Sequence, residues 1–488
     1  MRRRQLLATA LPAGALLPLA AGAHSFGRAY NLPVPLWLYL YGAAAALLLS
    51  FLVVAWFVAS PAQHGGGGGI ELGLRPWARA LRRLHLRELC RGLSLLALLL
   101  CIASGLFGTQ NPYANFNMTA FWVGFVLGFT YLTALLGDLY AWLNPWKTLA
   151  DGAAWLAQHL LPGRRAPLRY PVALAWWPAL GFYMAFIWIE LFGYLKPLPL
   201  SLILLAYTGL NLLGAALFGR AAWFRHCEFF AVYLGLVARM APLQHGPDRP
   251  GLRLRWPFAA VLDESPPHFS LLLFVLFMLS STAFDGLRET APWVKLFWGE
   301  VYGLLKPWVG DNFIAAYGRL RPWFLAWESA ALLLSPFLYL AVYLAFVWLM
   351  RRLTACAAPL GELALRFAAC LLPIALVYNI SHYYTLLVIQ GVKLPALASD
   401  PLGRGWDLLG TRDWFSAAVI PDAGVVWHVQ VGLIVFGHIV SVYLAHLEAL
   451  QLFPDRRRAV LSQVPMLFLM VAFTTAGLWI LSQPIKNG

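Results

Sequence analysis

The sequence predicts an all-α membrane protein, a polytopic bundle of about ten transmembrane helices that follows a cleaved signal peptide. Hydrophobic residues make up 61% of the 488 residues, charged residues make up only 12%, and the mean hydropathy is +0.68. An average soluble domain carries roughly 25% charged residues, and a soluble chain of this length cannot bury so much apolar surface. This composition excludes a soluble enzyme, a disordered scaffold and a disulfide-rich secreted domain.

Residues 1–23 are typical of a secretory signal peptide. Three arginines, Arg2 to Arg4, precede a short apolar stretch, and Ala21-Gly22-Ala23 is a small-x-small cleavage site. The apolar stretch is shorter than the ~20 residues that a membrane span needs, so we expect cleavage rather than an uncleaved anchor. Residues 24–488 would then form a single polytopic domain that begins with His24.

The rest of the chain contains ten apolar segments that are long enough to cross a bilayer. They lie at about 35–59, 91–108, 119–143, 171–190, 199–218, 268–284, 327–350, 366–390, 426–447 and 465–482. Two long segments between spans, near 285–326 and 391–425, are rich in Trp and Pro, and we expect them to cover one face of the bundle as loops.

The basic residues predict the orientation of these spans. If the mature chain starts outside, 22 of the 36 Lys and Arg residues fall in the five inner loops and 11 fall outside. Both mature ends and the two long loops would then lie in the periplasm, with the chain in a bacterial inner membrane. The net charge of +15 is explained by loops that face anionic lipid, so the bilayer rather than a nucleic acid is the expected partner.

Ionisable residues inside the spans are the most informative feature, because such groups are costly in hydrocarbon and usually face a bundle interior or a wet cavity. His382 and His438 fall at similar depths on consecutive spans, which are often neighbours. We expect one periplasm-facing cavity to be lined by His24, Glu190, Asp285, Glu328, His382, His428 and His438. The alternative is that each histidine bonds to a neighbouring helix and that the carboxylates at span ends are hydrated.

Imidazole and carboxylate groups together suit copper, zinc or iron, and the same set suits a proton relay. Cleavage after Ala23 would place an α-amine and an imidazole on His24, which makes copper the first choice. Haem is disfavoured because two spans with paired histidines are not found. The Walker A and Rossmann motifs are absent from the sequence, so no nucleotide cofactor is expected.

One segment between the spans, from Trp223 to Met240, combines arginines with several aromatic residues. We expect it to lie on the inner leaflet as an amphipathic stretch.

Several short motifs resemble a family of bacterial multi-pass membrane proteins that is often labelled fenitrothion hydrolase. The motifs are Ala23-His24-Ser25-Phe26-Gly27, Leu32-Pro33-Val34-Pro35-Leu36-Trp37, His226-Cys227-Glu228-Phe229-Phe230, Ser281-Thr282-Ala283-Phe284-Asp285-Gly286, His382-Tyr383-Tyr384 with Gln390-Gly391, and Gly437-His438 with Ala445-His446. The resemblance implies hydrolysis of an organophosphate ester, but it carries over no catalytic residue.

Three functions therefore stand as hypotheses. The first is binding or handling of a metal, copper as the first choice, by His24, His382, His428 and His438. The second is a membrane-bound, metal-dependent phosphotriester hydrolase, with Asp285 or Glu328 as the catalytic base beside a metal-bound water. The third is a proton-coupled transporter, or a membrane anchor for a periplasmic protein partner, in which the buried histidines and Asp138 move protons.

Overall fold

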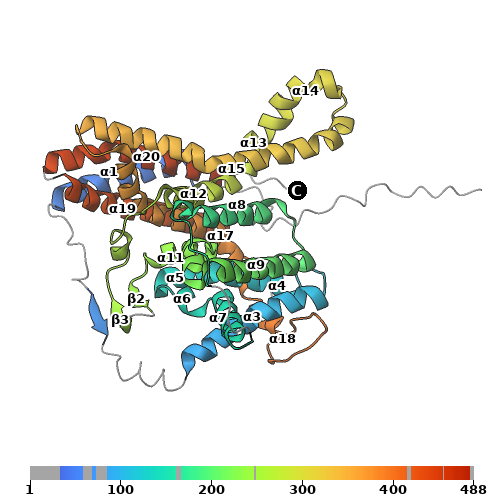
Figure 1. Cartoon of the computed structure of the whole chain (residues 1–488). Helices are drawn as coiled ribbons and strands as arrows, with labels where there is room; N and C mark the ends of the chain where they lie inside the picture. The colour runs from blue at the N-terminus through green and yellow to red at the C-terminus, as the bar shows by residue number, and fades with distance from the viewer. Residues whose placement is uncertain are drawn as a thin grey trace, which may run out of the picture.

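The computed structural model describes residues 33–58, 69–72, 85–160, 166–246, 249–414, 419–453 and 455–483. The predicted signal peptide and His24 lie outside the described residues. Within this part of the chain, ten helical segments are long and apolar enough to cross a membrane, and they confirm the predicted helix bundle (Figure 1). They are α1 (Leu36–Phe57), α3 (Leu86–Phe107), α4–η1–α5 (Phe116–Leu136), η2–α8 (Val172–Phe192), α9 (Pro197–Phe218), α12 (Phe269–Arg288), α15 (Phe313–Leu353), α16–η5–α17 (Leu360–Gly391), α19 (Ala423–Leu452) and α20 (Arg456–Ser482).

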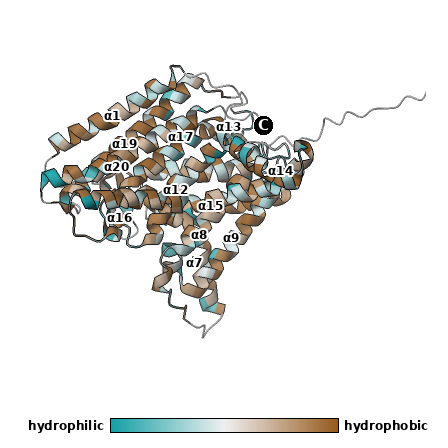
Figure 2. Ribbon diagram, turned by 90° about the horizontal axis from the view of Figure 1, so that it is seen from above, coloured by the Kyte–Doolittle hydropathy of each residue, from teal (hydrophilic) through white to brown (hydrophobic). Residues whose placement is uncertain are grey.

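Two of these segments form the centre of the bundle. The most apolar stretch of α12 is 83% buried and that of the Leu360–Gly391 segment is 72% buried, against 22% for α1. Helix α17 (Leu372–Gly391) packs against α19, α12 and η1 (Thr119–Phe129), whereas α1 packs against α19 and α20. Figure 2 shows that α1, α12, α17, α19 and α20 are largely hydrophobic. Polar groups on α12 and α17 are therefore shielded by the surrounding helices.

Glycines allow α17 to pack closely against its neighbours. A Cβ atom on Gly477 of α20 would lie 1.3 Å from the hydroxyl oxygen of Tyr378, and one on Gly437 of α19 would lie 2.3 Å from Cγ2 of Val377. Tyr378 and Val377 both belong to α17, so small residues on two partner helices accommodate its side chains. This close packing fixes the rotation of α17 about its own axis.

The seventh span starts earlier than the hydropathy predicts. Helix α15 begins at Phe313 rather than near 327, because Arg319, Arg321 and Pro322 lower the local hydropathy without ending the helix. Its first turns pack against η4 (Leu296–Val301) and α14 (Tyr302–Val309) around a separate small hydrophobic core. Trp327, further along α15, stacks on Trp293 of α13 (Ala291–Lys295). Together these elements form a helical arm that stands away from the bundle (Figure 1).

The expected surface position of the segment from Trp223 to Met240 is wrong. This segment forms α10 (Arg220–His226) and α11 (Phe229–Ala238), and α11 is enclosed by α5 (Thr130–Leu136), α6 (Tyr140–Leu143), α8 (Trp177–Phe192) and α10. Phe229, Leu234 and Val237 are all buried. The physical reason is that α11 is apolar all around, without a polar face that could meet water.

A small antiparallel sheet, which the sequence analysis did not predict, joins two segments between spans. Its strand order is β1 (Ile70–Leu72), β3 (Arg249–Leu254), β2 (Leu243–Gly246), and Leu254 lies opposite both Ile70 and Leu243. The remaining short elements are α4 (Phe116–Met118), α7 (Pro145–Leu160), η2 (Val172–Leu174), η3 (Ala259–Val261), α16 (Leu360–Ala368), η5 (Ala369–Leu371) and α18 (Leu394–Ser399).

Candidate functional site

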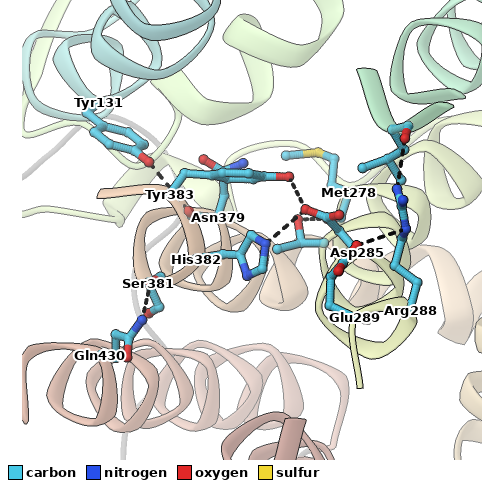
Figure 3. Close-up of polar contacts among 12 residues, drawn as sticks. Tyr131, Met278, Asp285, Arg288, Glu289, Asn379, Ser381, His382, Tyr383 and Gln430 are labelled. Carbon is cyan, nitrogen blue, oxygen red and sulfur yellow. Dashed lines mark hydrogen bonds and ion pairs between the residues drawn. The ribbon is translucent and has the colours of Figure 1, made fainter. Parts of the chain in front are cut away.

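A buried acid, an imidazole and a phenol meet between the two central helices. Asp285, in the last turn of α12, is 1% exposed. Its Oδ2 atom lies 2.9 Å from Nε2 of His382 and accepts a 2.8 Å hydrogen bond from the hydroxyl of Tyr383. Figure 3 shows both side chains reaching the carboxylate from α17. The contact between α12 and α17 thus includes a carboxylate and an imidazole that form an ion pair or share a proton inside the bundle.

The local packing explains how this cluster forms. Gly286 follows Asp285, and a Cβ atom at this position would lie 2.7 Å from Cγ2 of Ile480 and 3.8 Å from Cε1 of His382. The absence of a side chain therefore lets α20 and the His382 ring approach α12. The rings of His382 and Tyr383 lie perpendicular to one another at 4.6 Å, which places two donors on the same carboxylate oxygen.

The cluster can hold a proton in two arrangements. When the imidazole is protonated, the imidazolium and the carboxylate neutralise one another. When the imidazole is neutral, the carboxylate keeps the hydrogen bonds that His382 and Tyr383 donate to it. The side chain of His382 is 16% exposed while that of Asp285 is 1% exposed. The imidazole is therefore the more accessible member of the pair.

A small cavity adjoins this cluster. Its volume is about 30 Å³, and it lies between η1, α8, α11, α12 and α17. Aromatic side chains form most of its wall, and its polar lining consists of Thr130, Tyr183, Glu190, Tyr233, Ser281, Thr282, Asn379 and Tyr383. Tyr383 belongs to both the cavity wall and the Asp285 cluster, so the two features form one site.

Glu190 is the carboxylate of this cavity. It lies in the last turn of α8 and makes no hydrogen bond or ion pair with any residue that the structure describes. It is near enough to Asp285 for the two charges to interact. The site therefore contains two carboxylates, Glu190 in the cavity lining and Asp285 beside it, and the His382 imidazole contacts Asp285.

Another buried acid, Glu228, lies outside the ten spans and caps α11. It accepts hydrogen bonds from the hydroxyl of Tyr207 (2.5 Å), from Nδ2 of Asn144 (3.2 Å) and from the backbone amides of Phe230 (3.2 Å) and Ala231 (2.9 Å). Burial raises the pKa of Glu228 to about 7, and the four donors limit this rise. The arrangement is that of a structural helix cap.

The other predicted site residues lie in separate surroundings. Glu328 of α15 is 5% exposed, and its Oε1 atom lies 3.3 Å from Nε1 of Trp293. His428 of α19 contacts the carbonyl of Gly424 at 2.7 Å through Nδ1 and the hydroxyl of Tyr39 at 3.3 Å through Nε2.

His438 is completely buried on α19. Its Nδ1 atom lies 2.8 Å from the carbonyl oxygen of Ile434, one turn earlier in the same helix. Its Nε2 atom has no hydrogen-bond partner among the described residues, and its ring lies 6.3 Å from that of Tyr378. Sequence position gave His438 a depth similar to that of His382, but the two imidazoles have different partners.

Of the described residues that the sequence singled out as ligands or catalytic groups, the structure brings His382 and Asp285 into contact. Within the described ranges, no group of three or more His, Cys, Asp or Glu residues could hold a metal ion. His24 lies outside these ranges, so the four-histidine metal site stays a prediction.

Sequence reasoning missed two parts of the site. It did not assign a role to Tyr383, although this residue follows His382 directly, and it did not anticipate the cavity formed with α11. The adjacency of His382 and Tyr383 is the signal that could have indicated this role. A buried tyrosine hydroxyl needs a hydrogen-bond partner, and Tyr383 directly follows a histidine inside a span.

Comparisons with known proteins give no further guidance. No family model matches the sequence, and neither the curated proteins nor the solved structures contain a match. The likeness to the family labelled fenitrothion hydrolase therefore stays an expectation from short motifs.

Proposed function

We propose that the chain is a proton-translocating membrane protein, a proton-coupled transporter, in which the Asp285–His382 pair takes up and releases the proton. The observation that carries this proposal is the 2.9 Å contact between a carboxylate and an imidazole inside the two most buried helices. Ionisable groups in such positions are costly and mark proton or ion pathways.

The chemistry of the pair fits this role. Imidazole is the side chain whose charge changes near neutral pH. A proton that arrives at His382 creates an imidazolium that the Asp285 carboxylate stabilises. Loss of this proton leaves the Asp285 carboxylate, which still accepts a 2.8 Å hydrogen bond from the hydroxyl of Tyr383. The pair therefore changes its net charge while its geometry is kept.

The proposal includes the location of the chain in a bacterial inner membrane with both mature ends in the periplasm. The excess of Lys and Arg in alternate loops supports this orientation. In this orientation Asp285 lies toward the periplasmic end of α12, and His382 meets protons that enter from that side.

Proton flux into proteoliposomes tests the proposal. A potassium gradient with valinomycin sets the membrane potential, and a trapped pH-sensitive dye reports proton entry. We expect the wild type to acidify the vesicles and Asp285→Asn to reduce the rate at least tenfold. His159→Gln is the matched control, because His159 is exposed and its hydrogen bond and ring contact among the described residues are to Trp155 of its own helix.

Two results would contradict this proposal. One is a wild-type rate no higher than that of protein-free vesicles. The other is an Asp285→Asn rate equal to that of the wild type and of the His159→Gln control.

A second candidate function, copper binding, is favoured by the position of α1. The start of α1 packs against α19 so that Tyr39 contacts His428, and Cγ of Pro33 lies 3.6 Å from the Cβ position of Gly424. Pro33 is the ninth residue after His24, so the two are at most about 30 Å apart in extended chain. We propose that the amine and imidazole of a mature His24, together with His428, bind copper.

Mass analysis of the mature amino terminus and metal analysis of the same sample test this second function. We expect His24 as the first residue and one copper per chain, and a loss of most copper in His428→Ala but not in His159→Ala. Equal copper contents in the two variants would exclude His428. The phosphotriester hydrolysis implied by the resemblance needs a metal-activated water, so nitrophenol release by the copper-loaded sample tests the hydrolase alternative.

A further inference from the structure

Three of the polar side chains that line the cavity beside Asp285 already donate their own protons to other groups. Thr130 donates to the carbonyl of Val126 at 2.7 Å, Thr282 to the carbonyl of Met278 at 3.3 Å, and Tyr383 to Asp285. The Oδ1 atom of Asn379 is buried and has no hydrogen-bond partner among the described residues. A molecule that satisfies Asn379 and the Glu190 carboxylate must therefore donate hydrogen bonds.

The charge of the lining points in the same direction. Glu190 is its carboxylate, and the residues that line the cavity include no Lys, Arg or His. Glu190 lies in the last turn of α8, where the helix dipole is negative and disfavours an anion. A carboxylate in this position, without a partner among the described residues, is stabilised by a cation or a proton.

The walls and the size of the cavity define the cation. The rings of Phe186 and Phe229 lie 5.0 Å apart, and those of Phe125 and Phe230 lie 4.9 Å apart. Ring faces attract cations in desolvated sites. A volume of about 30 Å³ accommodates a group of about the size of a water molecule, which excludes a quaternary ammonium such as choline.

We propose that this cavity binds a small monovalent cation that donates hydrogen bonds, of the size of ammonium, between Glu190, Asn379 and the aromatic walls. The proposal rests on the proposed function and names its substrate class. A cation beside Glu190 repels the proton held by Asp285 and His382, because Glu190 and Asp285 interact electrostatically. A cation in the cavity thus favours loss of the proton from the pair, and protonation of the pair weakens cation binding.

Thermal unfolding of the purified full-length protein in detergent tests cation binding. Ammonium chloride replaces choline chloride at constant ionic strength, with sodium and potassium chloride as further probes. We expect ammonium to raise the Tm of the wild type in a saturable manner. Glu190→Gln should weaken the apparent affinity for ammonium at least tenfold, and Glu300→Gln, on the exposed surface of the helical arm, should leave it unchanged.

A second variant and a second readout separate binding from folding. Asn379→Leu removes the unpartnered acceptor and should also weaken ammonium binding at least tenfold. In weakly buffered solution with a pH indicator, ammonium should release protons from the wild type. Asp285→Asn should bind ammonium but release no proton, because the pair that holds the proton is absent.

The possible outcomes distinguish this proposal from the proposed function. If ammonium, sodium and potassium stabilise the wild type no more than choline does, the cation site is refuted, and proton flux into vesicles still decides the function. If ammonium binds and Glu190→Gln abolishes the binding while Asp285→Asn leaves proton flux unchanged, the cation site holds and the proposed proton pair fails. Equal ammonium affinity in wild type, Glu190→Gln and Asn379→Leu would overturn the assignment of these residues.

Discussion

Glu228 and Glu190 are both carboxylates enclosed by the helix bundle, yet their surroundings are opposite. Glu228 accepts hydrogen bonds from four donors and precedes the first turn of α11, where the helix dipole is positive. Glu190 lies in the last turn of α8, faces a cavity, and makes no hydrogen bond or ion pair with the described residues. Glu228 is therefore a structural cap, whereas the half-buried Glu190 is the acid that we propose binds a cation.

The largest expected effect is a difference in stability between variants of these two acids. Glu228→Ala leaves the side chains of Tyr207 and Asn144 and two backbone amides without their acceptor, so the free energy of unfolding should fall by about 3–5 kcal/mol. Glu190→Gln removes a charge that has no partner, so the free energy should change by less than about 1 kcal/mol or rise. Unfolding in mixed detergent measures both values, and equal losses would contradict the comparison.

The pH dependence of stability sharpens the same contrast. The pKa of Glu228 is raised from its ordinary value of 4.5 to about 7 by burial, and Tyr207 and Tyr140 are the titratable groups that act on it. Its contribution to stability is therefore complete below pH 4.5 and is lost as the pH rises toward 7. Relative to Glu228→Gln, the wild type should lose about 3 kcal/mol across this interval. A constant difference between the two unfolding curves would show that Glu228 keeps its ordinary pKa in the fold.

A smaller effect is expected from the pair that shares a proton. Asp285→Asn and His382→Gln each remove one side of the 2.9 Å contact, and a double-mutant cycle should give a coupling free energy of about 1–2 kcal/mol. The same cycle between Glu190 and His382 should give less than about 0.5 kcal/mol, because no hydrogen bond or ion pair joins them. Coupling of the same size in both cycles would place Glu190 in the proton pair.

The number and order of the spans follow from the sequence, because the need to match the bilayer makes hydropathy decisive. The partners of the polar side chains do not follow, because they depend on the rotation of each helix about its axis. His382 and His438 lie on neighbouring helices, as the sequence predicts, but Gly437 and Gly477 fix a rotation of α17 in which His382 meets Asp285. His438 instead bonds to the carbonyl of Ile434 in its own helix.

The sequence predicts the wrong position for helix α11 for a related reason. Its ten residues are too few to span a bilayer, and the nearby Arg225 and Arg239 suggested a surface position. The deciding residue is Glu228, whose four hydrogen bonds allow the start of an apolar helix to be buried. Acids that precede short apolar segments therefore indicate buried helices as well as surface caps.

The cavity wall formed by η1 is a π-helix of eleven residues, from Thr119 to Phe129. Such helices close each hydrogen bond one residue later than an α-helix does, and they are rarely so long. Tightening a single turn to α geometry would turn every residue beyond it by about 100°. Phe125 and Val126 line the cavity from η1, so a rotation of this size would change which side chains of the segment line it.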